Sequence, residues 1–282
     1  MIDPRTIVST NWLALHLKSP DVRIVDGSFY LPDARRNAYE EYQQAHIPGA
    51  VFFDIDEISD EKSPYPHMLP KPEKFASRVR ALGLGDGNQI VVYDGSGIFS
   101  AARVWWMFKV MGHDDVAVLD GGLPKWRREG RPVTDDITAL TPRHFTARMN
   151  HALIRSADEV LEALETGRET VVDVRGAERF QGRSPEPRQG VRSGHMPGAI
   201  NLPYRDLFAE DGTLLKGEAL KARIRAAGVK PSDHIVTSCG SGVTAAILLL
   251  ALDTLGYRNL ALYDGSWSEW GSREDLPIAT GA

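Results

Sequence analysis

Short apolar runs alternate with longer amphipathic stretches along most of the chain. IVVY at 90–93, HIVTS at 234–238 and LALY at 260–263 have the length and composition of buried strands. Between such runs, stretches such as FASRVRALG and ALKARIRAAG have the pattern of helices. The alternation predicts an α/β fold, with mostly parallel sheets flanked by helices.

The same order of sequence landmarks occurs twice. IVDGS matches VVDVR, AHIPGAVFFD matches GHMPGAINLP, IVVYDGSG matches IVTSCGSG, and LDGGLPKW matches YDGSWSEW. The offsets are 147, 149, 145 and 144 residues, measured from Asp26 to Asp173, His46 to His195, Asp94 to Cys239 and Trp126 to Trp270. Near-constant offsets indicate a duplicated domain.

The boundary between the two copies is predicted from composition. The run from Thr134 to Ala152 is polar, has weak periodicity and holds Pro142, as is common between domains. We therefore expect an N-terminal domain at 1–140, a linker at 141–152 and a C-terminal domain at 153–282.

The repeat also separates scaffold from candidate chemistry. His46 and His195 occupy matching His-x-Pro-Gly-Ala runs, so we expect both to hydrogen-bond a turn and neither to be catalytic. For the same reason Trp270, which repeats Trp126, is expected to be scaffold.

The loop CGSG, starting at Cys239, follows a predicted strand and runs directly into an apolar helix. This geometry directs backbone N–H groups and the positive end of the helix toward the sulfur, which stabilises a thiolate. The companion loop begins at Asp94, and a carboxylate cannot carry transferable sulfur. We expect the first domain to be catalytically silent.

Cys239 has three other possible interpretations. Most free cysteines are small buried hydrophobes, but the glycines after this one make that less probable than a reactive thiol. A tyrosine-type phosphatase needs an Arg six positions after its Cys, and Ala245 stands there. A non-catalytic binding module of this kind is expected to lack the cysteine.

Composition and charge argue against several classes of protein. The net charge of −5, with basic residues scattered, gives no footprint for nucleic acid or an anionic membrane. One cysteine cannot form an internal disulfide or a cysteine-rich metal site, so no metal and no cofactor are expected. Without a signal peptide or membrane span, the chain is expected in the cytoplasm, as a monomer.

The tandem halves, the paired His-x-Pro-Gly-Ala runs and the loop CGSGVTA resemble the rhodanese superfamily. The segments FFDID, SPYPHMLP, RVWWMF, SPEPR and YDGSWSEW are also similar to it. Thiosulfate-using relatives carry basic residues directly after the Cys. This chain has Gly240 and Ser241 instead, which favours the branch that uses 3-mercaptopyruvate.

The resemblance implies roles for particular residues. Ser241, His67 and Asp56 form the implied proton-transfer set around Cys239, with the last two supplied by the silent half. Arg179 and Arg188 are implied to bind the substrate carboxylate, although the residues alone do not favour them over Arg183 or Arg192. The loop amides implied to stabilise charge at sulfur are those from Gly240 through Gly242 and Val243 to Thr244.

The activity implied by the resemblance is a two-step sulfur transfer. Cys239 takes the sulfur of 3-mercaptopyruvate as a persulfide, releasing pyruvate, and then passes the sulfur to a thiol, thioredoxin or cyanide. The alternative within the superfamily is thiosulfate:cyanide sulfur transfer.

Overall fold

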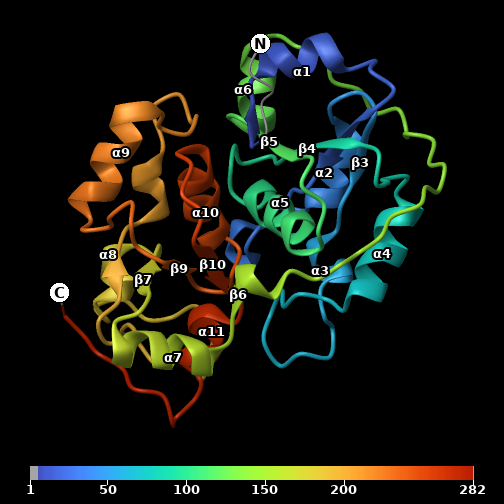
Figure 1. Ribbon diagram of the computed structural model, residues 1–282. Coiled ribbons are helices and arrows are strands. Elements are labelled where there is room, and N and C mark those ends of the chain that lie inside the picture. The colour runs from blue at the N-terminus through green and yellow to red at the C-terminus, as the bar shows by residue number, and fades with distance from the viewer. Residues whose placement is uncertain (1–5, 282) are drawn as a thin grey trace. The chain divides into compact units, whose positions relative to one another are not determined.

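The computed structural model describes residues 6–281, and these fall into two compact units (Figure 1). The first unit runs to residue 60, continues over 69–150 and includes 209–214. The second comprises 61–68, 151–208 and the chain from 215 onward. Segment 61–68 therefore belongs to the unit formed mainly by the second half of the chain. The boundaries expected at 140 and 153 stay a prediction.

A five-stranded parallel sheet forms the centre of the first unit, in the order β1-β5-β4-β2-β3. Its strands are β1 (Ile7–Val8), β2 (Val22–Asp26), β3 (Ala50–Phe52), β4 (Gln89–Tyr93) and β5 (Val116–Leu119). The helices are α1 (Thr10–His16), α2 (Ala38–Gln44), α3 (Ile55–Ile58), α4 (Pro72–Ala81), α5 (Ala101–Val110) and α6 (Gly122–Arg128), with a 3₁₀ turn η1 (Pro32–Ala34). Helix α5 packs on β4 and β5, and its Trp105 and Trp106 are buried.

The second unit repeats this sheet in the order β6-β10-β9-β7-β8, again entirely parallel. Its strands are β6 (Ile154–Arg155), β7 (Thr170–Asp173), β8 (Ile200–Asn201), β9 (Ile235–Ser238) and β10 (Leu260–Tyr263). The helices are α7 (Ala157–Thr166), α8 (Ala177–Phe180), α9 (Gly217–Ala226), α10 (Ala245–Thr254) and α11 (Ser266–Trp270), with 3₁₀ turns η2 (His151–Leu153) and η3 (Tyr204–Leu207). The predicted α/β duplication is confirmed.

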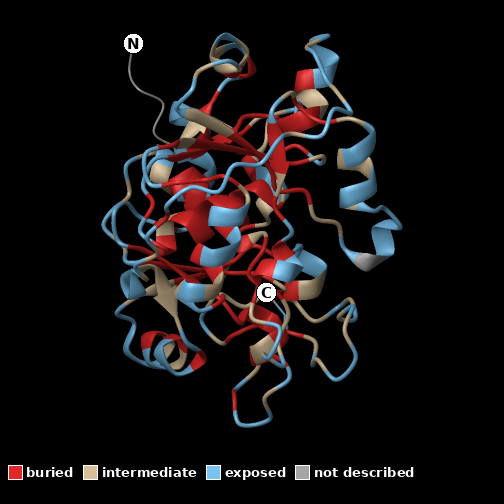
Figure 2. Ribbon diagram, turned by 90° about the vertical axis from the view of Figure 1, so that its right-hand side faces the viewer, coloured by how far each residue is buried: buried red, intermediate tan, exposed pale blue. Residues whose placement is uncertain are grey.

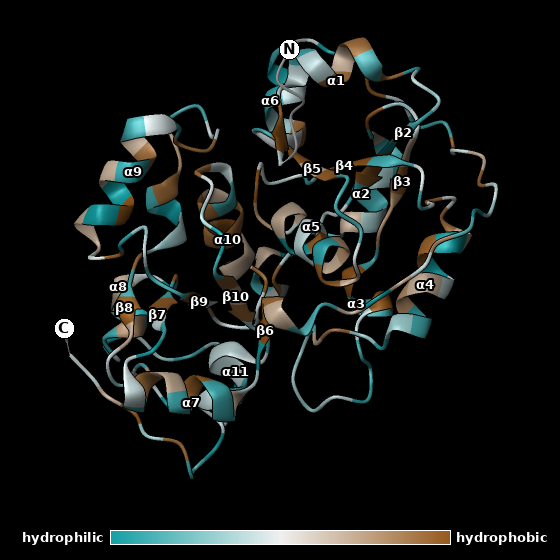
Figure 3. Cartoon of the chain, in the orientation of Figure 1, coloured by the Kyte–Doolittle hydropathy of each residue, from teal (hydrophilic) through white to brown (hydrophobic). Residues whose placement is uncertain are grey.

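Burial explains why some helices are apolar on every side and others are amphipathic. Helix α10 lies against β9 and β10, and all of its residues from Ala245 to Leu252 are buried, so it is apolar on every side. Helix α9 buries only Leu220 and Ile224, and Figure 3 shows polar and apolar residues alternating along it. Figure 2 shows buried residues in the interior, in strands and in central helices, with exposed residues on the outside. No helix in the described part of the chain is long and apolar enough to span a bilayer.

Residues that both halves share have structural roles, as the repeat predicted. The indole nitrogens of Trp126 and Trp270 donate to the carbonyl oxygens of Pro132 and Pro277 at 2.7 and 2.8 Å. In the second unit, Nδ1 of His195 lies 2.9 Å from the carbonyl oxygen of Phe180. In the first, Nδ1 of His46 lies 2.7 Å from the carbonyl oxygen of Tyr42. Both histidines therefore fix their turns.

The buried Asp26 at the end of β2 gives a pH-dependent prediction. Burial raises the pKa of its carboxyl to about 6 from an ordinary 3.8, with Asp94 adding to the effect. Because this pKa is higher in the folded than in the unfolded chain, the folded state gains a proton first. We expect the free energy of unfolding to fall as pH rises from about 4 through about 6, by at most about 3 kcal/mol from this group.

Asp26→Asn lacks the titrating carboxyl and should therefore be more stable than the wild type near neutral pH and similar to it at about pH 4. Urea unfolding of both proteins across that range measures the difference. Parallel stability curves would show that Asp26 is not the group responsible.

Candidate active site

Cys239 lies between β9 and α10 in the second unit and is 1% exposed. Its backbone N–H donates to Oγ of Ser266 at 3.2 Å, and the Ser266 hydroxyl donates to the carbonyl oxygen of Tyr263 at 2.8 Å. The carbonyl oxygen of Cys239 accepts from the backbone N–H of Trp267 at 3.0 Å. The first turn of α11 thus fixes the cysteine backbone from both sides.

Two features of the same turn tighten this arrangement. The Gly240 carbonyl oxygen accepts both the N–H and the hydroxyl of Ser268, at 2.9 and 2.5 Å. Ser266 has φ of +49°, a left-handed conformation that costs a non-glycine residue energy. That conformation belongs to the residue whose hydroxyl accepts the cysteine N–H.

The companion loop in the first unit binds an anion with its backbone. One carboxylate oxygen of Asp94 accepts the N–H of Ser96 at 2.7 Å, and the other accepts those of Phe99 and Ala101 at 2.7 and 2.9 Å. The two loops share a glycine at positive φ, Gly97 at +116° and Gly242 at +75°. Where the first domain carries this internal anion, the second carries a thiol.

At the offset of 145 residues, the amides of Ser241, Thr244 and Ala246 correspond to those three. Ser241 is 5% exposed, Gly242 and Val243 are buried, and Thr244 is the N-cap of α10. The Cys239 side chain thus occupies the position that corresponds to the Asp94 carboxylate of the first unit.

Arg179, at the end of α8, lies over the cysteine loop. A Cβ atom added to Gly240 would be 3.2 Å from Nη2 of Arg179 and 3.8 Å from Nη1. A side chain at position 240 would therefore displace the guanidinium by a few tenths of an ångström, which glycine avoids. Its side chain is 30% exposed, and Nη2 donates to Glu186 at 2.5 Å.

The first unit places a different group at the matching position. The hydroxyl of Tyr30 lies so close to Gly95 that an added Cβ would collide with it. That hydroxyl donates to Glu41 at 2.7 Å, and Arg36 stacks 3.8 Å above the tyrosine ring. A phenol thus lies over the Asp94 loop, whereas a guanidinium, which can pair with an anion, lies over the cysteine loop.

The four arginines of the stretch 176–194 have different surroundings. Arg183 forms a surface ion pair with Glu178, and the two side chains are 59% and 62% exposed. Arg192 donates to backbone carbonyl oxygens, including that of Gly271 at 3.1 Å, and so anchors the chain. Arg188 is half-buried two residues after Glu186. The roles of Arg179 and Arg188 in binding substrate stay a prediction.

His67 belongs to the same compact unit as Cys239, and Asp56 does not. His67 is 9% exposed, with φ of +61°, and it lies in segment 61–68 of the second unit. Burial raises the pKa of Tyr263, with Tyr65 of that segment among the other causes, so the segment runs near the end of β10. Asp56 is exposed in the first turn of α3, in the first unit. Its role beside His67 stays a prediction.

Sequence reasoning missed two buried charged residues near the site, Arg175 and Glu186. Arg175 is 1% exposed, donates to Asp173 at 2.7 Å and to Glu186 at 2.8 Å, and lies 4.2 Å from the ring centre of Trp267. The repeat held a signal for Arg175: Asp26 matches Asp173, but Ser28 stands where the second unit has Arg175.

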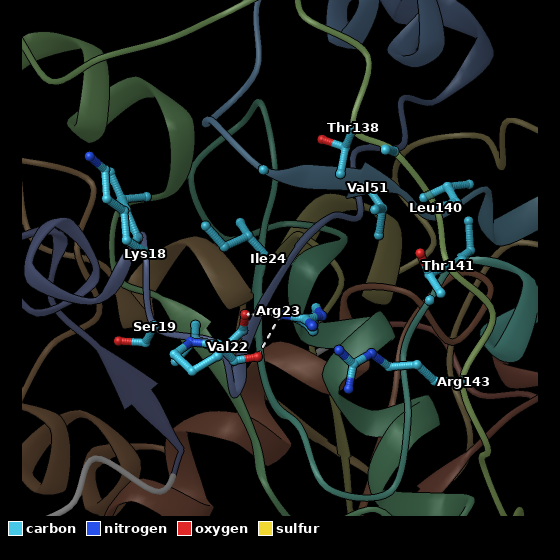
Figure 4. Close-up of a pocket in the computed structure, with 16 residues that line it drawn as sticks. Lys18, Ser19, Val22, Arg23, Ile24, Val51, Thr138, Leu140, Thr141 and Arg143 are labelled. Carbon is cyan, nitrogen blue, oxygen red and sulfur yellow. Dashed lines mark hydrogen bonds between the residues drawn. The ribbon is translucent and has the colours of Figure 1, made fainter.

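A cavity of about 370 Å³ lies in the first unit and is separate from the loop at Asp94 (Figure 4). The Arg23 and Arg143 side chains extend into it, and burial together with Arg143 lowers the pKa of Arg23. No Cys, His, Asp or Glu is among its lining residues. Its lining therefore offers no thiol, imidazole or carboxylate. Over residues 6–281, no cluster of three His, Cys, Asp or Glu side chains could hold a metal ion.

Comparison with known proteins identifies related chains. The family model for the rhodanese-like domain matches residues 9–129 and 156–273. "Thiosulfate/3-mercaptopyruvate sulfurtransferase 1, mitochondrial" of Arabidopsis thaliana is 44% identical over 96% of this chain and 77% of its own. The 3-mercaptopyruvate sulfurtransferase of Escherichia coli K12 is 44% identical over 96% of both chains. The crystal structure of SseA from Escherichia coli, a 3-mercaptopyruvate sulfotransferase, superposes with a TM-score of 0.85 at 41% identity, covering 93% of this chain and 98% of that one.

Proposed function

The chain belongs to the rhodanese-like domain family, in two tandem copies, and from this premise we propose that it is a 3-mercaptopyruvate sulfurtransferase. Relatives with that activity in their names match nearly the whole chain. Cys239 is the proposed sulfur carrier. The domain at 153–282 is proposed as the catalytic one, and the domain at 1–140 as its non-nucleophilic partner across the linker 141–152.

One observation carries the proposal: the loop at Asp94 holds a carboxylate on three backbone N–H groups, and the matching loop holds a cysteine. The carboxylate offers two oxygens, whereas a thiolate offers one sulfur. A persulfide adds a terminal sulfur that carries the negative charge, so it places an anion further into the loop than a thiolate does. The amides from Gly240 through Gly242 and Val243 to Thr244 are proposed to stabilise it.

In the first step, the Cys239 thiolate attacks the thiol sulfur of 3-mercaptopyruvate. An S–S bond forms, and the C–S bond breaks with its electron pair moving to carbon, so that pyruvate leaves as its enolate. The proton of the donor thiol passes from the new persulfide to the enolate carbon, which leaves the persulfide anionic. Arg179 and Arg188 are proposed to bind the donor carboxylate, since planar guanidinium groups pair with carboxylates through two hydrogen bonds.

In the second step, an acceptor nucleophile attacks the outer sulfur and Cys239 leaves as a thiolate. Cyanide becomes thiocyanate and a small thiol becomes a persulfide; reduced thioredoxin is a further proposed acceptor. Neither step requires an external oxidant or reductant. The cytoplasmic compartment stays a prediction, since one relative is named as mitochondrial.

A donor panel tests the proposed function. We expect kcat/KM with 3-mercaptopyruvate to exceed that with thiosulfate when both are measured with cyanide as acceptor. The test matters because the name of the Arabidopsis relative includes both donors. Faster turnover with thiosulfate would overturn the donor while leaving sulfur transfer intact.

We propose that the protons of the first step are transferred by Ser241, His67 and Asp56. Ser241→Ala should lower kcat/KM for 3-mercaptopyruvate by about 100-fold or more, the usual range for loss of an acid–base group. Ser272→Ala, which changes an exposed serine in the same unit, is the control. Thermal unfolding of both variants separates chemistry from stability, and an unchanged rate in Ser241→Ala would remove Ser241 from this role.

A further inference from the structure

Glu186 holds two arginines at once from a buried position. Its side chain is 3% exposed; Oε2 accepts from Nη2 of Arg179 at 2.5 Å, and Oε1 accepts from Nη1 of Arg175 at 2.8 Å. A longer bond of 3.3 Å joins Nε of Arg179 to Oε1. Both carboxylate oxygens are therefore occupied by guanidinium groups.

Arg175 anchors this acid to the central sheet. It donates to Asp173, at the end of β7, from Nε and Nη2 at 2.9 and 2.7 Å, and to the carbonyl oxygen of Gly194 at 2.8 Å. Its guanidinium also lies against Trp267, whose backbone N–H binds the Cys239 carbonyl oxygen. Glu186 is thus held by groups that are themselves fixed.

The orientation of Arg179 follows from these contacts. Glu186 takes the side of the guanidinium formed by Nε and Nη2, whereas the atoms nearest to Gly240 are Nη2 and Nη1. An arginine side chain that is 30% exposed has several rotamers open to it. Glu186 selects the one in which the terminal nitrogens face the cysteine loop.

The first unit folds the same sheet without this network. Ser28 stands in place of Arg175, and the side chain over the silent loop is Tyr30, held by Glu41 of α2. The fold does not require a buried acid joined to two arginines. Its presence in the unit with the cysteine indicates a role in the reaction.

We propose that Glu186 is a positioning residue: by fixing the Arg179 guanidinium over the cysteine loop, it sets the affinity for the carboxylate of the sulfur donor. The inference rests on the proposed function, because it takes the donor to be a carboxylate. Glu186 itself does not touch the donor.

The first experiment compares Glu186→Gln with the wild type in each half-reaction. We expect KM for 3-mercaptopyruvate to rise about 10- to 100-fold, the range for losing a charge-assisted hydrogen bond. Discharge of a preformed persulfide to cyanide should keep its rate, because that step has no donor carboxylate. Glu178→Gln, which breaks the exposed pair with Arg183 on the same stretch, should change neither.

A double-mutant cycle separates positioning from general stability. If Glu186 acts through Arg179, then Glu186→Gln should add less than about two-fold to the KM of Arg179→Ala, whereas independent effects multiply. Multiplied effects, or equal losses in both half-reactions, would overturn the inference. Glu186→Asp, which keeps the charge but shortens the reach, replaces the glutamine variant in the same cycle if that variant does not fold.

Binding of pyruvate, measured by calorimetry, tests Glu186 independently of turnover. We expect Kd to rise by a similar factor in Glu186→Gln and Arg179→Ala. Equal affinity in wild type and Glu186→Gln would overturn the positioning role even if the enzyme is active. A wild-type chain that binds pyruvate but does not turn over 3-mercaptopyruvate would overturn the proposed function and not the positioning.

Discussion

Cys239→Ser is expected to eliminate sulfur transfer, with kcat reduced by about 10⁴-fold or more, as when other enzymes lose their nucleophile. Serine keeps the size of the side chain, so the hydrogen bonds of the cysteine backbone to Ser266 and Trp267 should persist. A hydroxyl at neutral pH is a far weaker nucleophile than a thiolate, and this chain has no second cysteine to replace it.

Intact-mass measurement makes this result specific. The wild type incubated with 3-mercaptopyruvate should gain the mass of one sulfur atom and lose it again when cyanide is added. Cys239→Ser should gain nothing, whereas Ser272→Ala should behave as the wild type. A sulfur adduct on Cys239→Ser, or an unmodified wild type after donor treatment, would exclude the persulfide mechanism.

The fold and a candidate nucleophile could be predicted from the sequence because both predictions depend on local patterns. Strand-length apolar runs and helical stretches fixed the α/β class, and near-constant offsets between landmarks fixed the duplication. The comparison of Asp94 with Cys239 then pointed to one half as the site of chemistry. The structure adds that the Asp94 loop already binds an anion on its backbone.

Arg175 and Glu186 were not accessible in the same way. They lie in or beside a stretch without periodicity, where spacing in sequence says little about burial or partners. A glutamate between two prolines, in SPEPR, has the pattern of an exposed loop residue, yet its side chain is 3% exposed. Only the tertiary arrangement of β7, α8 and α11 creates the position between two guanidinium groups.

His67 illustrates a second limit of sequence reasoning. The family resemblance named it, but segment 61–68 belongs to the unit that holds Cys239, even though both neighbouring segments belong to the other unit. Membership of this kind depends on long-range contacts that no local pattern encodes. The left-handed backbone of His67, at φ of +61°, is a further feature that no sequence pattern predicted, because few residues other than glycine adopt it.

Asp94→Ala is expected to destabilise the first unit by about 3–5 kcal/mol, because three buried or partly buried N–H groups lose their charged acceptor. Asp94→Asn should cost less, about 1–3 kcal/mol, since its one amide oxygen can still accept from two of the three donors. Urea unfolding of the three proteins measures this order. A loss below about 1 kcal/mol in Asp94→Ala would mean that the loop keeps its shape without an internal anion.

The same variants test whether the carboxylate is structural or catalytic. Below its unfolding temperature, Asp94→Ala should still form the sulfur adduct on Cys239, since the silent loop has no part in the proposed chemistry. Loss of the adduct in a folded Asp94→Ala protein would assign Asp94 a role in sulfur transfer. Retention of the adduct with reduced stability would mean that the Asp94 carboxylate has a structural role. The same backbone loop would then hold a carboxylate in the first unit and sulfur in the second.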